Sequence, residues 1–205
     1  MSPVKSKIIL DLCGGTSSWS RPYKEAGYDV RVITLPDHDV RTYHPPENVH
    51  GILAAPPCNQ FSFAKSTGKP RDLRKGMEIV FACLKIIAEC QYKIRTPFAH
   101  VTKLKFWALE NPDGLLKRFL GRPTYEFDPW EFGHNYQKRT YLWGWFNDPQ
   151  KLIKDKTQAM SKEDIERCKT NSRILPGYIR NLPSTGDKRA ITPKGFATAF
   201  FKANP

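Results

Sequence analysis

Residues 51–62 read Gly-Ile-Leu-Ala-Ala-Pro-Pro-Cys-Asn-Gln-Phe-Ser, and the interpretation of the whole chain depends on this stretch. Its apolar first half is typical of a buried strand. Pro56 and Pro57 then end the strand and stiffen the chain that leaves it. Cys58 follows at the carboxyl end, where open α/β sheets place their ligands and their chemistry. Cys58 is therefore either a small apolar residue in a loop or a nucleophile.

The composition indicates one globular domain with a sizeable core. The chain has 205 residues, of which 40% are hydrophobic and 26% are charged. No apolar run is as long as a membrane span, and the N-terminus shows no signal region, so we expect an intracellular, cytoplasmic protein with no membrane partner. The net charge of +13 favours a polyanionic partner such as nucleic acid, although a generally basic protein is the alternative.

The cysteines and histidines do not form a metal-binding or disulfide pattern. Five cysteines are an odd number and none are spaced as CxxC, which argues against a disulfide framework and a zinc knuckle. Five scattered histidines include no HxxxH pair. We expect no metal site.

The N-terminal third predicts a strand, a glycine turn, a helix and a second strand. The strands are expected at 7–12 and 28–34, with a tight turn at 13–20 and a short helix at 21–26. Small residues in such a turn let the backbone approach a ligand closely. The turn does not match GxGxxG, and an ordinary tight turn is the alternative.

A basic segment and a long helix follow Cys58. The segment could close over a phosphate backbone or be merely solvated, and its candidate nucleic-acid contacts are Lys65, Lys69, Arg71 and Arg74. The helix is expected over 72–91, with Cys83 and Cys90 buried. Its predicted core face consists of Met77, Val80, Phe81, Leu84, Ile87 and Ala88.

A further strand at 106–109 ends in Glu110 and Asn111. If the strands are parallel, this carboxylate and amide lie at the same edge of the sheet as Cys58. A short helix is expected at 113–120, an irregular segment at 123–131 and β-structure at 137–146. These elements predict a three-layer α/β domain with a mostly parallel, twisted sheet. A final helix at 192–203 should dock on that domain.

Five motifs fall in order at predicted strand ends: 11–15, 39–40, 56–58, 110–111 and 137–139. With Phe61-Ser62 and Leu109, they resemble the cytosine-C5 DNA methyltransferase family, and in particular its short phage and prophage members. The resemblance covers about 7–144 and resumes in the last helix. It implies a Rossmann-like S-adenosylmethionine-dependent methyltransferase fold, with a catalytic domain at 1–146, a small basic target-recognition region at 147–190 and a returning helix at 191–205.

The resemblance also implies a mechanism. Cytosine C5 is a poor nucleophile, and the family activates it by adding a cysteine thiolate to C6. Cys58 matches that cysteine and Glu110 the carboxyl group at the ring nitrogen N3. Asn111 matches the residue that braces the cysteine loop, and Arg139 an arginine that reaches the flipped base. The implied partner is double-stranded DNA with a flipped cytosine.

S-adenosylmethionine is the implied methyl donor and cofactor. Asp39 matches the residue that meets its adenine amine. The other implied cofactor residues are Asp11, Cys13, Gly14, Gly15, Thr16 and Pro57. They comprise the glycine turn and the proline that precedes Cys58.

Several positions depart from the family pattern. Cys13 stands where an aromatic ring stacks on adenine, no acidic residue ends the second strand, and Tyr141 replaces a second arginine. Two alternatives therefore remain open. One is a nucleic-acid-binding protein on a methyltransferase scaffold without catalysis, and the other is a methyltransferase acting on RNA or a modified pyrimidine.

Overall fold

The computed structural model describes residues 6–63, 70–92, 104–170 and 190–205. Its strands are β1 (Ile8–Leu12), β2 (Asp29–Ile33), β3 (Val49–Ala54), β4 (Phe106–Pro112), β5 (Tyr125–Phe127) and β6 (Thr140–Trp145). Its α-helices are α1 (Arg21–Glu25), α2 (Leu73–Gln91), α3 (Lys117–Leu120), α4 (Lys162–Thr170) and α6 (Lys194–Ala203). Three 3₁₀ turns occur at η1 (Cys58–Gln60), η2 (Pro129–Phe132) and η3 (Lys156–Gln158).

The strands of the described residues form one six-stranded sheet in the order β2-β1-β3-β4-β6-β5. Neighbours from β2 to β4 are parallel, whereas β6 runs antiparallel to both β4 and β5. The predicted α/β class is confirmed. The sheet is mixed rather than uniformly parallel because β6 enters it in the opposite direction.

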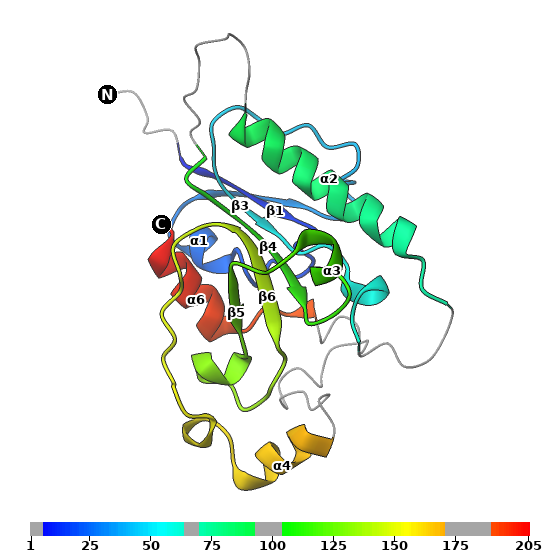
Figure 1. Cartoon of the computed structure of the whole chain (residues 1–205). Helices are drawn as coiled ribbons and strands as arrows, with labels where there is room; N and C mark the ends of the chain where they lie inside the picture. The colour runs from blue at the N-terminus through cyan, green and yellow to red at the C-terminus, as the bar shows by residue number, and fades with distance from the viewer. Residues whose placement is uncertain (1–5, 64–69, 93–103, 171–189) are drawn as a thin grey trace.

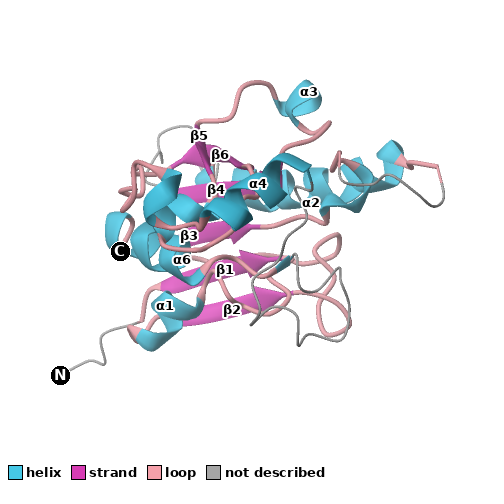
Figure 2. Ribbon diagram, turned by 90° about the horizontal axis from the view of Figure 1, so that it is seen from below, coloured by secondary structure: helices cyan, strands magenta, loops and turns pink. Residues whose placement is uncertain are grey.

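Helices cover both faces of the sheet, as Figure 1 and Figure 2 show. Alternating side chains of β1 separate the two cores: Leu10 and Leu12 pack toward α2, and Ile9 packs toward α1 and α6. This alternation is the period-two pattern of a strand that is buried on both faces. The parallel strands therefore share one carboxyl edge, which lies between the two helical layers.

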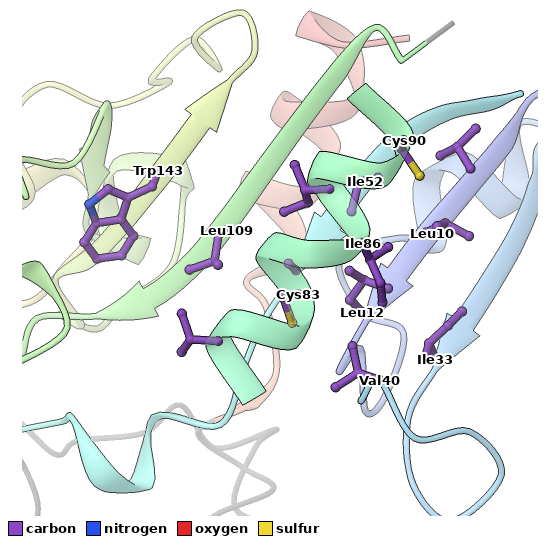
Figure 3. Close-up of a cluster of buried hydrophobic side chains, with 14 of the residues drawn as sticks. Leu10, Leu12, Ile33, Val40, Ile52, Cys83, Ile86, Cys90, Leu109 and Trp143 are labelled. Carbon is purple, nitrogen blue, oxygen red and sulfur yellow. The ribbon is translucent and has the colours of Figure 1, made fainter. Parts of the chain in front are cut away.

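Helix α2 confirms the predicted helix at 72–91. Asp72 caps it, and its carboxylate accepts a hydrogen bond from the Lys75 amide at 2.9 Å. The buried stripe consists of Gly76, Val80, Cys83, Ile86, Ile87 and Cys90. Figure 3 shows Cys83 and Ile86 against Leu12 and Ile52 of the strands.

The predicted core face of this helix was partly wrong. Phe81 is 60% exposed, and Ala88 is also exposed. The buried stripe is turned toward Cys83, Ile86 and Cys90 relative to the predicted face, so Phe81 and Ala88 lie on the exposed side. The predicted burial of Cys83 and Cys90 is confirmed.

The segment after β3 differs from the predictions in three places. Strand β4 continues to Pro112, because pairing with β6 supplies partners for Glu110 and Asn111, so these residues lie within the strand rather than after it. The predicted helix at 113–120 is reduced to α3, because Asp113 and Leu115 donate backbone hydrogen bonds to other segments. The predicted irregular segment at 123–131 contains β5 and η2.

The final helix α6 docks on the domain as predicted, although it begins at Lys194 rather than Thr192. Phe196 stacks on Phe127 of β5 with ring centroids 3.9 Å apart, and Phe200 meets Trp19 edge to face. In the part of the chain that is described, no helix combines the length and apolarity needed to span a membrane.

Candidate functional site

The order of the strands creates a switch point between β1 and β3. From β1 the chain moves outward to β2, and from β3 it moves in the opposite direction to β4. In open α/β sheets, ligands bind outside the carboxyl ends of the strands at such a point. The glycine turn follows β1 and the Cys58 loop follows β3, so both flank this crevice.

Cys13, Gly15 and Ser17 of the turn after β1 have φ angles of 59°, 52° and 56°. Left-handed backbone is uncommon for cysteine and serine, and such conformations gather at functional sites. The Cys13 amide donates to the Ile33 carbonyl at 2.8 Å, which fixes the turn to β2. Gly15 and Thr16 are exposed, so the turn presents its backbone to solvent.

Asp11 lies beneath this turn. A Cβ atom at Gly14 would lie 2.3 Å from the Asp11 Cγ, so only glycine fits above the carboxyl group. The Ser20 hydroxyl donates to Asp11 Oδ2, while Oδ1 is buried and has no hydrogen-bond donor among the described residues. Burial raises the pKa of Asp11 to about 6, and the Ser20 hydrogen bond partly offsets that rise.

The thiol of Cys13 points toward α2. Cys13 packs against the core cluster beneath that helix and hydrogen-bonds to the Cys83 thiol. This hydrogen bond, followed by burial, raises the pKa of Cys83. The sulfur that replaces the family's aromatic ring is thus held by the protein interior.

Cys58 begins the 3₁₀ turn η1 immediately after the exposed Pro57. Its carbonyl accepts hydrogen bonds from the amides of Phe61 and Ser62 at 2.9 and 2.8 Å. Cys58 itself is half-buried and is not part of a disulfide. The two prolines and the 3₁₀ turn therefore give the cysteine a defined position at the end of β3.

Three contacts join the Cys58 loop to the end of β4. The Asn111 side-chain amide donates to the Pro56 carbonyl at 2.9 Å, which is the bracing contact that the resemblance implies. The Leu115 amide donates to the Phe61 carbonyl at 2.9 Å, and Ser62 forms a β-bridge with Gly114. These contacts bring the segments that carry Cys58 and Glu110 to the same edge of the sheet.

Glu110 lies one residue beyond Leu109, which is level with Ala54 of β3 and, through it, with Leu12 of β1. Neighbouring strands are about 4.8 Å apart, so the ends of β1 and β4 are separated by roughly 10 Å. Burial raises the pKa of Glu110, and Lys138, whose Nζ lies 4.0 Å from Glu110 Oε1, partly offsets the rise. A carboxyl group whose pKa is raised by burial is suited to proton transfer.

Two expected site residues form hydrogen bonds with other charged side chains. The Arg139 guanidinium donates to Asp128 at 3.0 Å and to Glu126 at 3.1 Å, so it is directed toward β5 and the turn that follows it. The Asp39 carboxylate accepts from the Arg41 guanidinium at 3.0 Å, and this hydrogen bond lowers the pKa of Asp39. Arg139 thus makes its side-chain contacts with β5 and the turn after it, whereas the adenine contact expected of Asp39 stays a prediction.

The candidate nucleic-acid contacts fall into three groups. Lys65 and Lys69 lie outside the described residues. Arg74 is exposed in the first turn of α2. Arg71 donates instead to the carbonyls of Gln60 and Ser62 in the Cys58 loop, both at 2.9 Å.

Tyr141 faces a different surface from Glu110. A pocket of about 600 Å³ opens between α3 and β5, and it is lined by Lys117, Gly121, Arg122, Pro123, Thr124, Tyr125, Glu126 and Tyr141. The Lys117 Nζ lies 5.3 Å from the centre of the Tyr141 ring. The residue that replaces the family's second arginine therefore lines this pocket, on the α2 side of the sheet.

Sequence reasoning missed the roles of Lys138 and Arg71. Lys138 follows Gln137 in the motif from which Arg139 was chosen, and the alternation of side chains along β6 could have identified it. Arg71 was grouped with its basic neighbours by charge alone. No sequence signal separates an arginine that binds carbonyls from one that binds phosphates.

The chain was compared with known protein families and with curated protein sequences. No model of a known protein family matches the chain, and no curated protein sequence matches it. Among the residues that the structure describes, no three His, Cys, Asp or Glu side chains are grouped so that they could hold a metal ion. The site is therefore interpreted from its own residues.

Proposed function

We propose that this protein is an S-adenosylmethionine-dependent methyltransferase that transfers a methyl group to C5 of a flipped cytosine in DNA. The observation that carries the proposal is the junction of the Cys58 loop with the Glu110 segment through Asn111, Leu115 and Gly114. The chemistry needs a thiol and a carboxyl group that act on opposite sides of one pyrimidine ring, and this junction supports that arrangement.

In the proposed mechanism, the Cys58 thiolate adds to C6 of cytosine, and Glu110 donates a proton toward N3 as the ring accepts the electron pair. S-adenosylmethionine would supply the methyl group that C5 takes, and S-adenosylhomocysteine would be the leaving group. Loss of the C5 proton and expulsion of Cys58 restore the ring. The raised pKa of Glu110 supports its role as the acid, because burial favours the protonated form of its carboxyl group.

The cofactor would lie against the turn after β1. The exposed Gly15 and Thr16 and the close packing of Gly14 on Asp11 leave room for a ligand to approach the backbone. The switch point between β1 and β3 supports this location, as does a Rossmann-like interpretation of the sheet. S-adenosylmethionine would supply the electrophilic methyl group there.

Trapping on fluorinated DNA tests the proposal. In a 5-fluorocytosine duplex the methylated adduct cannot lose a proton from C5, so the protein stays attached through Cys58. We expect a cofactor-dependent covalent adduct that Cys58→Ala abolishes. Cys168→Ala is the matched control, because Cys168 is a half-buried cysteine on α4, and it should leave the adduct unchanged.

The absence of an adduct on every duplex tested would overturn the proposed activity on DNA. An adduct on fluorinated RNA alone would instead identify RNA as the substrate. Calorimetry with S-adenosylmethionine separates the remaining alternative. DNA binding without cofactor binding would indicate a non-catalytic scaffold, an outcome to which the inward-facing Cys13 lends weight.

A further inference from the structure

We infer that Arg71 is a positioning residue that holds the Cys58 loop in place, rather than a ligand of the DNA backbone. Its Nη1 donates to the Gln60 carbonyl and its Nη2 to the Ser62 carbonyl, each at 2.9 Å. These carbonyls lie on either side of Phe61, which is fully buried. One planar guanidinium therefore spans the loop two and four residues beyond Cys58.

A second set of contacts fixes the same loop to α2. The Asp72 amide donates to Gln60 Oε1 at 2.8 Å, next to the residue that supplies the guanidinium. Gly76 in the second turn of the helix packs directly on the loop, because a Cβ atom there would lie 2.9 Å from Gln60 Cβ and from Phe61 Cζ. The loop is thus held by side chain, backbone and packing contacts at one end of α2.

The position of α2 makes this attachment rigid. The helix is 19 residues long, and its buried stripe packs on β1 and β3 through the core that Figure 3 shows. Contacts with the first two turns of α2 therefore fix the position of the Cys58 loop relative to the sheet. On the opposite side, Asn111 and Leu115 tie the loop to β4. The loop is held between the helix and the strand.

The geometry requires arginine. A guanidinium is a planar fork that can donate two hydrogen bonds to two acceptors at once, whereas a lysine ammonium is a compact charge on a flexible stem. Arg71→Lys therefore keeps the positive charge but not the two-point contact. Charge and positioning can be separated by this single substitution.

The experiment compares Arg71→Lys with Arg74→Lys, which makes the same change at an exposed position in the first turn of the same helix. The first readout is the rate at which iodoacetamide alkylates Cys58 in the full chain without DNA or cofactor, followed by peptide mass spectrometry. We expect Arg71→Lys to accelerate alkylation by about threefold, because a loosened loop exposes the half-buried thiol. Arg74→Lys should leave the rate unchanged.

The second readout is methyl transfer, and it rests on the proposed function. Misplacement of a reacting group by about 1 Å can reduce a rate by up to roughly 100-fold, so we expect Arg71→Lys to lower kcat by about 10-fold. The KM for DNA and its salt dependence should match those of Arg74→Lys. Thermal unfolding of both variants is the control that tests whether the fold is intact.

Unchanged alkylation and unchanged kcat in Arg71→Lys would overturn the inference. So would Arg71→Ala behaving as the loss of a phosphate contact, with weaker DNA binding, a lower salt slope and an unchanged alkylation rate. Faster alkylation in a protein that transfers no methyl group would support the positioning role and refute the proposed function. The experiment can therefore refute the positioning role of Arg71 and the proposed methyltransferase activity independently of each other.

Discussion

The buried carboxyl group of Asp11 makes a specific prediction about stability and pH. Asp11 is 1% exposed, and its carboxyl group has one hydrogen-bond donor, Ser20, among the described residues. An ionised carboxylate in such a position is costly because burial removes its hydration. Asp11→Asn keeps the shape of the side chain and removes the charge. We expect the variant to gain stability relative to the natural protein as pH rises.

The sign follows from the pKa in the two states. Burial raises the pKa of Asp11 from an ordinary 3.8 to about 6, so between these values the folded state holds the proton more tightly than the unfolded chain. The contribution of Asp11 to stability is therefore present at low pH and is lost as pH rises through about 6. One pKa unit is worth about 1.4 kcal/mol, so the full loss is about 3 kcal/mol, of which about 2 kcal/mol falls between pH 4 and pH 7.5.

Urea unfolding at pH 4 and pH 7.5 measures the effect. The difference in the free energy of unfolding between Asp11→Asn and the natural protein should grow by about 2 kcal/mol in favour of the variant across this range. Comparing the two pH values cancels any pH-independent cost of burying the amide. Asp37→Asn is the matched control, because Asp37 is exposed and its charge carries no burial cost.

A difference that stays constant between the two pH values would refute the reasoning. It would mean that Asp11 is hydrated or paired in solution, and that the turn after β1 does not cover it. A difference that grows in the opposite direction would mean that the carboxylate is stabilised by its surroundings.

Two further predictions concern the end of β4. Lys138→Gln removes the cation that opposes the burial shift at Glu110, so the pKa of Glu110 should rise and the pH profile of methyl transfer should move upward. A downward or absent displacement would contradict the pairing. Gly114→Ala places a Cβ 2.4 Å from the Phe61 carbonyl oxygen and should lower the free energy of unfolding by about 1–3 kcal/mol in thermal denaturation. That loss should exceed the loss in Gly27→Ala, where a Cβ meets no atom within 4 Å and only a left-handed backbone opposes the change.

Local patterns predicted much of the fold. The apolar runs at 8–12 and 49–54 are buried strands because both faces of the sheet are covered, and continuous hydrophobicity is the sign of such strands. The helix α2 was predicted from the three- and four-residue spacing of its apolar side chains. The glycine turn and the Cys58 loop follow β1 and β3 as predicted, because these parallel strands share one carboxyl edge.

The remaining features depend on partners that are distant in the chain. The extension of β4 to Pro112 requires the antiparallel strand β6. The short β5 also requires β6, which is its one neighbour among the described strands. Neither pairing is visible in a local window of sequence. The burial of Gly76 likewise depends on the Cys58 loop, which packs on the start of α2 and is distant from it in the chain. Such features are set by packing rather than by local propensity.

The register between β4 and β6 determines whether Lys138 or Arg139 lies beside Glu110. Leu142 of β6 pairs with Glu110 of β4, so the two side chains lie on the same face of the sheet. Side chains alternate between the two faces along a strand, so even-numbered residues that precede Leu142 also lie on the face of the sheet that carries Glu110. Lys138 falls on that face, and its ammonium lies 4.0 Å from the carboxylate. Arg139 falls on the other face with Glu126, to which it is paired. A motif match selected the arginine by its identity, but the register of two antiparallel strands places the lysine beside the acid. A shift of that register by one residue would exchange the two cations, and the Lys138→Gln pH profile would then remain that of the natural protein.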